Sequence, residues 1–534
     1  MTKSIKTRLL RGATALVAGA AMLGSAAVAN AKPIRIESEN IIFYGDVKPS
    51  LAGEMIEKWE IYRRMVMALS GIDNPQPDPE KLTVYGFYDT QELQDFTGRR
   101  GIAGVYTRGA EGPIFLTSVN KKYTDNGFSE QVGLHEYTHH VLHALVTDGF
   151  PRWYDEGFAN YLSTMEIDDE VIRIGVPSAA HLRAIEGGWA EWISPQTVLG
   201  AIDRYPSMGL KERKKGGTTS FYAQSWLYVH YLRNTPKYDG TLGKYIRLLD
   251  DPSVKPLDAF EQAHGVSVDD FHKEAVEYYK ANKFSIDQYE PGETFMKVDI
   301  KANALTEEQL ANERIIANLS FLNDDSAKVL KSNVKGAEKI DPDSPRVAAA
   351  YVALDGLNER YDTAIMRADA ALSKNPNDKM LLRSAGQARL MATMGPAWDK
   401  AKRYERVEFK PDATAMEGVK MLERVLAQDE FDYLSIISLT NLYGKSDLEP
   451  SRTIVKSAFI LEDRYMDSVN SDWGMDLANI YAKAGDWEGA CRMADVVRGL
   501  NADKKKRETG NSPARLAHFD ASFPGECESG AAGN

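Results

Sequence analysis

The sequence predicts an α+β domain in the first half of the chain and an all-α helical solenoid in the second half. From about 34 to 283, stretches with the period of a strand alternate with stretches with the period of a helix. Beyond about 305, nearly every stretch has helical spacing, and the pattern repeats with an offset of 34 residues. Between the halves, Pro291, Gly292 and mixed charges interrupt the periodicity, so we expect a linker over 285–304.

The first 31 residues have the features of a signal peptide. Four basic residues precede a small, apolar run over 13–28, and Ala29-Asn30-Ala31 is the small-x-small pattern after which a signal peptidase cuts. The run is too short and too alanine-rich for a comfortable membrane span, and a retained anchor is the alternative. We therefore expect an exported protein without membrane insertion after cleavage, periplasmic by default or else secreted.

The chain is acidic, with 65 basic residues, 77 acidic residues and a net charge of −12. The leader holds four of the basic residues and no acidic one, so the mature chain is near −16 (61 minus 77). Without a basic tract, such a chain is a poor partner for nucleic acid or for an anionic membrane. We therefore expect a peptide or protein partner and no nucleic acid.

There are two cysteines, Cys491 and Cys527. Two are too few for a disulfide scaffold, and they exclude a cysteine-rich zinc site. In an oxidising compartment they could pair and tie the C-terminal tail, 504–534, to the last helix. Two independent thiols are the alternative, with equal weight.

Within the first half, three stretches rich in β-branched and aromatic residues predict strands, and one longer stretch predicts a helix. The strands are expected over 41–44, 82–87 and 114–117. Apolar residues at helical spacing predict the helix over 51–69.

The second half repeats itself over 305–503. Asp341-Pro342-Asp343 recurs 34 residues later as Asn375-Pro376-Asn377, and a second such pair starts at Leu426 and Ile460. An aromatic residue followed by alanines at the third and seventh positions also occurs twice, which lets two helices approach closely. These residues are Tyr361, Ala364 and Ala368, and Trp487, Ala490 and Ala494.

This pattern resembles the tetratricopeptide repeat, whose period is 34 residues. Gly485-Asp486-Trp487 is similar to that family's Gly-Asp-Tyr signature between paired helices. The resemblance implies about five degenerate repeats in a tetratricopeptide-like solenoid. Its concave face would bind a substrate, a protein partner or a neighbouring copy of the chain.

One motif carries chemistry: His135-Glu136-Tyr137-Thr138-His139. On a helix, residues four apart lie one turn apart on the same face, so both imidazoles can bind one zinc ion at about 2.0–2.1 Å. Glu136 stands beside the first of them, where it can take a proton from a water that the metal activates.

A third ligand should come from a neighbouring element. Residues 148–151 break the first helix, and a second amphipathic stretch follows over 153–161. Within it, Glu156 is 17 positions beyond His139 and can return to the metal from an antiparallel helix. The small residue Gly157 permits that helix to pack closely.

The segments HEYTH and WYDEGFANY together resemble the gluzincin clan of zinc metallopeptidases, especially the small bacterial peptidase MA-like families and, more distantly, the aminopeptidase N superfamily. The resemblance covers 34–283, about half of the chain. It implies a zincin-like metallopeptidase domain over 32–284 that hydrolyses peptide bonds. It also implies one zinc ion, with His135, His139 and Glu156 as ligands and Glu136 as the catalytic base.

The resemblance further implies a tyrosine that opens a later helix and stabilises the oxyanion of the tetrahedral intermediate. Tyr222 lies at the corresponding place, although packing within an aromatic helix is an alternative role for it. His230, eight residues on, is a weaker rival. The stretch 114–117 resembles the clan's edge strand, which pairs with an extended substrate.

The chain departs from the aminopeptidase N-like enzymes at the segment whose Glu binds the substrate's free amine. There the family has Gly-x-Met-Glu-Asn, whereas Gly109-Ala110-Glu111-Gly112-Pro113 lacks the Met and the Asn, so we expect an endopeptidase. Asp155 is expected either to orient an imidazole or to be a solvated surface residue. His140 is expected to pack or to face solvent, and His143 to line the site.

A non-catalytic binding or scaffold protein is the competing interpretation. The helical repeats would then be the working surface, and the metallopeptidase-like domain would be degenerate. Loss of Glu136 or of a metal ligand would favour this alternative. None of these residues is lost, so we expect a zinc-dependent peptidase.

Overall fold

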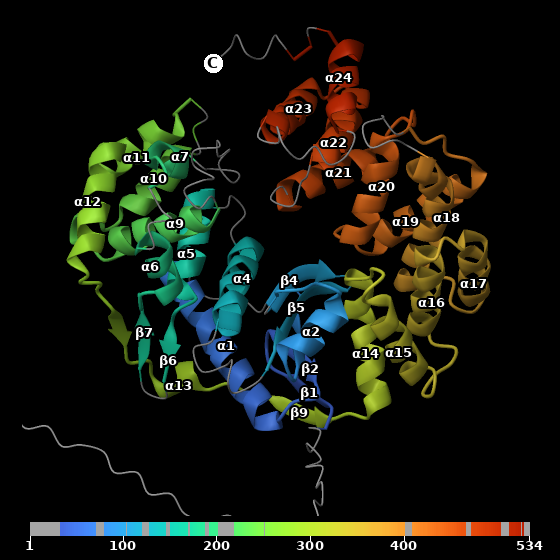
Figure 1. Ribbon diagram of the computed structural model, residues 1–534, viewed down its shortest axis with the longest axis horizontal. Helices are drawn as coiled ribbons and strands as arrows, with labels where there is room; N and C mark the ends of the chain where they lie inside the picture. The colour runs from blue at the N-terminus through green and yellow to red at the C-terminus, as the bar shows by residue number, and fades with distance from the viewer. Residues whose placement is uncertain are drawn as a thin grey trace, which may run out of the picture.

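The chain folds into a mixed α/β N-terminal half and a C-terminal helical region (Figure 1). The expected leader, 1–31, and the last residues, 528–534, lie outside the described residues. The computed structural model describes residues 32–527 except 71–79, 103, 110, 120–127, 146–149, 169–170, 187–191, 201–217, 250, 252, 401–407, 466–470, 503–511 and 525. Within those ranges, no helix combines the length and the apolar character needed to cross a bilayer.

A six-stranded sheet organises the N-terminal half, in the order β4-β5-β3-β2-β1-β9. The strands are β1 (Ile34–Glu37), β2 (Ile41–Gly45), β3 (Leu82–Phe87), β4 (Gly104–Gly109), β5 (Gly112–Ser118) and β9 (Lys301–Ala304). β2, β3 and β5 run parallel to one another, whereas β1, β4 and β9 are antiparallel to the strands they pair with. The strands expected over 41–44, 82–87 and 114–117 are confirmed as β2, β3 and β5.

The predicted position of the edge strand is wrong. Residues 114–117 lie in β5, which pairs with β4 on one side and with β3 on the other. The edge strands of the sheet are β4 and β9, and β4 also packs against α4 (Phe128–Leu145). Glycines at both ends of β4 leave too short an alternating pattern for the sequence to reveal it.

Helices cover both faces of this sheet, because alternate residues of each strand point to opposite faces. On one face lie α4 and α1 (Pro49–Leu69), which confirms the helix expected over 51–69. The Trp59 ring contacts Phe115 and Tyr137 there, with centroids 5.3 Å apart in each pair. On the other face lie α2 (Thr90–Thr97) and α14 (Glu307–Ser320).

A second group of helices completes the N-terminal half beside α4. In it, α5 (Arg152–Leu162) packs against α4 and against α9 (Thr218–Arg233). A small sheet, β6 (Glu166–Ile167), β7 (Ile172–Ile174) and β8 (Asp287–Tyr289), lies below α5 and α6 in Figure 1. The other helices are α6 (Ala179–Glu186), α7 (Pro195–Leu199), η1 (Pro236–Tyr238), α10 (Thr241–Leu249), α11 (Pro256–His264) and α12 (Val268–Ala281).

The segment expected to be a linker is structured. It contains β8, the short helix α13 (Glu293–Met296) and β9. β8 pairs with β7, and β9 pairs with β1, so the chain returns to the main sheet before it enters the helical region. All four residues of β9 are exposed, so β9 buries neither face and is held in the sheet by its backbone pairing with β1.

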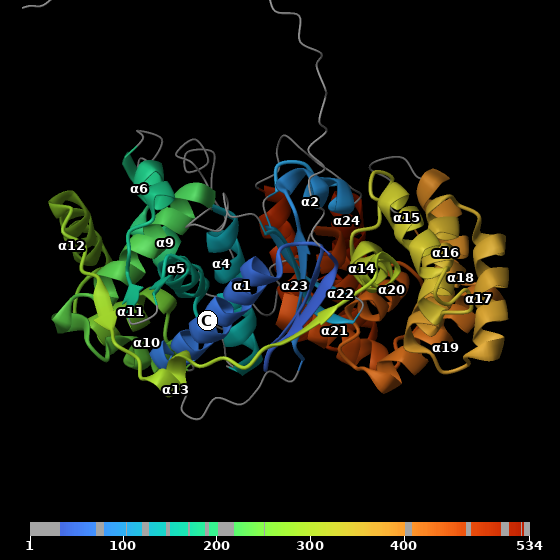
Figure 2. The ribbon, with the colours of Figure 1, turned by 90° about the horizontal axis from the view of Figure 1, so that it is seen from below.

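The C-terminal helical region consists of paired helices, five pairs within the described residues. Each helix packs against its partner, and the first helices of successive pairs also contact one another. The pairs are α14 with α15 (Ala327–Ala337), α16 (Pro345–Leu357) with α17 (Tyr361–Lys374), α18 (Lys379–Lys400) with α19 (Ala413–Gln428), α20 (Tyr433–Gly444) with α21 (Arg452–Tyr465), and α22 (Ser471–Lys483) with α23 (Trp487–Ala502). In both views α14 lies between the sheet and the helices α15, α16 and α17 (Figures 1 and 2).

The small residues noted in the repeats lie where helices meet. Ala364 and Ala368 are fully buried between neighbouring helices, as are Ala490 and Ala494. A further helix, α24 (Ser512–Ser522), packs against α22 and α23 within the expected tail. Cys491 and Cys527 form a disulfide, so the pairing alternative is confirmed.

Candidate metal centre

Three donor atoms from α4 and α5 converge. The Nε2 atoms of His135 and His139 lie 3.2 Å apart, and Oε2 of Glu156 lies 3.1 Å from the first and 3.4 Å from the second. Zinc bound tetrahedrally at about 2.0–2.1 Å requires donor atoms about 3.3–3.4 Å apart. The three sides of this triangle therefore match the spacing that one small metal ion needs, and the side chains are only 15, 12 and 2% exposed.

The backbone explains why these side chains meet. His135 and His139 are one turn apart on α4, so their imidazoles lie on the same face. α5 begins directly after Pro151, which cannot continue a preceding helix. Gly157 then lets α5 approach α9, because an added methyl group would lie 2.5 Å from the backbone oxygen of Ser225. This close packing sets the position of α5, and with it the position of Glu156 relative to the two histidines.

Charged neighbours hold two of the three donors. Oδ2 of Asp155 lies 3.1 Å from Nδ1 of His139, and Nη2 of Arg152 lies 2.5 Å from Oε1 of Glu156. The expectation that Asp155 pairs with an imidazole is confirmed, and the solvated alternative is wrong because Asp155 is buried. Arg152 is not among the site residues predicted from the sequence, although its position one turn before Glu156 is a usable signal.

The electrostatics of the cluster favour a cation. Burial lowers the pKa of His139, but Asp155 and Glu156 outweigh burial and raise that pKa well above its ordinary value. Burial raises the pKa of Glu156, but the two imidazoles outweigh it and hold that pKa well below its ordinary range. The two carboxylates therefore stabilise a positive charge at this site, and a divalent metal ion could take the place of the proton on His139.

The two predicted catalytic residues lie beside this cluster. Glu136 follows His135 on α4 and is partly exposed. The ring of Tyr222, in the second turn of α9, stands edge-on to the ring of His135, with centroids 6.1 Å apart. The structure therefore brings Tyr222 against a candidate metal ligand.

His230, the weaker rival of Tyr222, is engaged elsewhere. It is fully buried two turns farther along α9. Its Nε2–H donates to the carbonyl oxygen of Gly175 at 2.9 Å, and its Nδ1 accepts from the Tyr278 hydroxyl at 2.9 Å. These contacts show that His230 packs within the N-terminal half, among α9, α12 and the segment around Gly175.

Other histidines near the site differ in their surroundings. His140 is buried, stacks on Tyr137 and has Nδ1 3.0 Å from the hydroxyl of Tyr106, so it joins α4 to the edge strand. His181 on α6 is close enough to His135 that burial and this neighbour lower the pKa of His181 to about 4. No sequence signal marks His181, because it reaches the site only through the packing of α6 on α9. The side chain of His143 lies outside the described residues.

No protein-family model matches this chain, and a search of curated proteins gives no significant match. The donor triangle, its buried charges and the adjacent tyrosine are the features that any proposal has to explain.

Proposed function

We propose that this chain is an exported, zinc-dependent peptidase of the gluzincin type, acting as an endopeptidase. The observation that carries the proposal is the triangle of His135 Nε2, His139 Nε2 and Glu156 Oε2, whose sides of 3.2, 3.1 and 3.4 Å suit tetrahedral zinc. Two imidazoles and one carboxylate leave a fourth position open, which is typical of catalytic rather than structural zinc sites. The periplasm is the compartment we propose.

Zinc held by these three residues would supply Lewis acidity for hydrolysis. In the proposed mechanism, Glu136 takes a proton from the attacking water and returns one to the leaving amine. The hydroxyl of Tyr222 donates a hydrogen bond to the oxygen that becomes negative in the transition state. Asp155 and Arg152 keep His139 and Glu156 aimed at the metal, so that little reorganisation is needed.

An extended peptide is the substrate form that suits the architecture. β4 is an edge strand and lies against α4, so a peptide could add to the sheet beside the metal ligands. Glu111 is in ion-pair contact with Lys379 and Arg383, which leaves it poorly suited to bind a substrate's free amine. This engagement supports endopeptidase over exopeptidase activity. The tetratricopeptide-like helical region would recruit the substrate or a partner.

The proposal is tested by measuring zinc content and cleavage of an unfolded protein substrate by the wild type and by Glu136→Gln. We expect about one zinc ion in each protein and cleavage by the wild type alone. Glu130→Gln is the matched control, because Glu130 lies on the same helix in an ion pair with Lys58. This control should retain both zinc and activity.

Three outcomes would contradict the proposal. A wild type that binds no zinc would show that the donor triangle has another role. A wild type that binds zinc but cleaves no unfolded substrate would favour the binding-protein alternative. Equal activity of the wild type and Glu136→Gln would remove Glu136 from the mechanism.

A further inference from the structure

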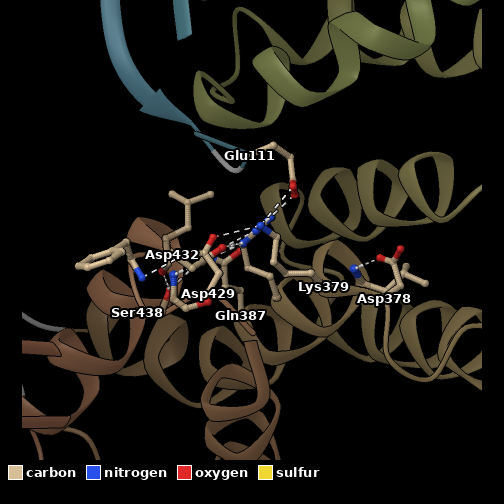
Figure 3. Close-up of polar contacts among 12 residues, drawn as sticks. Glu111, Asp378, Lys379, Gln387, Asp429, Asp432 and Ser438 are labelled. Atoms are coloured by element: carbon tan, nitrogen blue, oxygen red, sulfur yellow. Dashed lines mark hydrogen bonds and ion pairs between the residues drawn. The ribbon is translucent and has the colours of Figure 1, made fainter. Parts of the chain in front are cut away.

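The turn between β4 and β5 is held by the helical region, a contact between parts of the chain far apart in sequence. Glu111, at this turn, has Oε2 3.3 Å from Nζ of Lys379 and Oε1 3.5 Å from Nη2 of Arg383. Both cations belong to α18. In Figure 3, Glu111 reaches from the turn down to Lys379 on this helix.

The cations that meet Glu111 are themselves fixed. The guanidinium of Arg383 is 2% exposed and binds both carboxylate oxygens of Asp432, at 3.0 and 2.9 Å from its Nε. Asp432 caps α20 by accepting from the backbone N–H of Ser435 at 2.9 Å. Lys379 also bonds Asp429, at 3.1 Å. Glu111 therefore meets a prearranged pair of charges that joins α18 to α20.

The same strand is also held from the opposite side. The Tyr106 hydroxyl of β4 lies 3.0 Å from Nδ1 of His140 on α4. In addition, α20 itself packs against β4, because the helical region bends back toward this end of the sheet (Figure 1). The edge strand β4 thus contacts α4, which carries the candidate metal ligands, and also α14 and α20 of the helical region.

We propose that Glu111 is a positioning residue through which the helical region sets the place of β4, the strand on which an extended substrate would pair. The inference rests on the proposed peptidase function, and it assigns the helical region a role within its own chain. When Glu111 loses its charge, the turn after β4 loses its ion pairs with α18, and β4 keeps its pairing with β5 and its packing against α4, α14 and α20. Peptide binding then weakens, while the metal ligands stay in place.

The test uses Glu111→Gln and Lys379→Gln in the full-length protein, with amide hydrogen exchange of 104–109 as the first readout. A partly exposed ion pair contributes modestly, so exchange should accelerate about threefold in each variant, with zinc content unchanged. The double variant should show less than the sum of the two effects, because both substitutions break one contact. In steady-state kinetics, KM for an unfolded substrate should rise about threefold with kcat little changed.

Glu308→Gln is the matched control. Glu308 is 32% exposed, as Glu111 is, and it pairs with Lys339 within the helical region at 3.4 Å. It should alter neither exchange over 104–109 nor KM. Unchanged exchange in Glu111→Gln, or an equal effect of Glu308→Gln, would overturn the proposal. If no variant cleaves any substrate, the proposed function fails, and the exchange data alone decide whether Glu111 positions the strand.

Discussion

At the scale of single residues, the candidate metal centre depends on second contacts of its ligands. Nδ1 of His139 faces Asp155, and Oε1 of Glu156 faces Arg152. The second donor atom of each side chain, Nε2 of His139 and Oε2 of Glu156, is thereby left to face Nε2 of His135. Each side chain is thereby held in one orientation before a metal arrives. A preformed site loses less conformational entropy on binding than a flexible one.

A buried histidine outside the candidate metal centre, His264, bears on how stability depends on pH. His264 lies among aromatic rings, with Phe260 stacked at 4.2 Å, and burial lowers the pKa of His264 to about 4. Its Nδ1–H donates to the carbonyl oxygen of Phe260 at 2.8 Å, and its Nε2 has no hydrogen-bond partner among the described residues. The fold therefore favours the neutral imidazole.

We predict that the protein loses stability as the pH falls from 6.5 to 4. The unfolded chain binds the proton first, so this histidine alone removes about 3 kcal/mol of unfolding free energy over that interval. Urea unfolding at several pH values, with a chelator present throughout, measures the effect. In His264→Gln this part of the pH dependence should disappear. The exposed His518 provides the control, and His518→Gln should leave the slope unchanged.

At the scale of elements, the approach of α5 to α9 limits what residue 157 can be. An alanine side chain there would lie 2.5 Å from the backbone oxygen of Ser225 and 2.7 Å from Cγ2 of Val229. A backbone carbonyl within a helix cannot move away without displacing α9. We therefore predict that Gly157→Ala lowers the unfolding free energy by about 1–3 kcal/mol. Zinc affinity should fall as well, because Glu156 is the adjacent residue.

Gly356→Ala tests whether this effect comes from the contact or from the substitution itself. Gly356 also lies in a helix, α16, but an added methyl group meets nothing within 4 Å. This variant should be as stable as the wild type or slightly more stable, because alanine favours the helix. Thermal unfolding and zinc titration of both variants decide the matter. Equal stability of Gly157→Ala and the wild type would contradict the packing argument.

The spacing of apolar residues along the sequence predicted the helices and strands that bury one face. It did not predict strands that bury neither face. The helix expected over 51–69 is α1, Pro49–Leu69, because its apolar residues pack on the sheet. The polar strand β9 gave no signal, since its Lys-Ala-Asn-Ala sequence is exposed and only its backbone pairs. At the site, local spacing predicted that two histidines and Glu156 could converge. The nearness of His181 to His135 depends on how separate helices pack, which local sequence does not encode.

At the scale of the whole molecule, the two halves share a buried core. Ala317 and Phe321, from the first helix pair of the helical region, pack in one cluster with Phe87 and Leu116 of the sheet. Arg314 of α14 crosses the same boundary, with Nη2 2.9 Å from Asp46. The sequence predicts a linker over 285–304, directly before α14, because Pro291, Gly292 and mixed charges interrupt the periodicity there. The buried face of α14 nevertheless belongs to the sheet.

We therefore predict that a fragment covering 32–304 is unstable, whereas one covering 32–341 is better folded. The shorter fragment lacks α14, so Phe87, Leu93 and neighbouring apolar residues of this cluster become exposed to water. It should bind a hydrophobic dye and unfold at a lower temperature or without a cooperative transition. The longer fragment keeps α14 and α15, and its sheet stays covered.

The longer fragment also serves as the control for truncation itself, because it exposes a different surface, where α15 and α14 meet α16. Both fragments therefore expose apolar surface and can bind the dye. The cooperativity of thermal unfolding is the property that distinguishes them. If α14 belongs to the core of the sheet, only the longer fragment shows a single cooperative transition. The same transition temperature in both fragments would mean that the N-terminal half folds without α14. The packing of α14 on the sheet and on β4 would then add little to the stability of the N-terminal half.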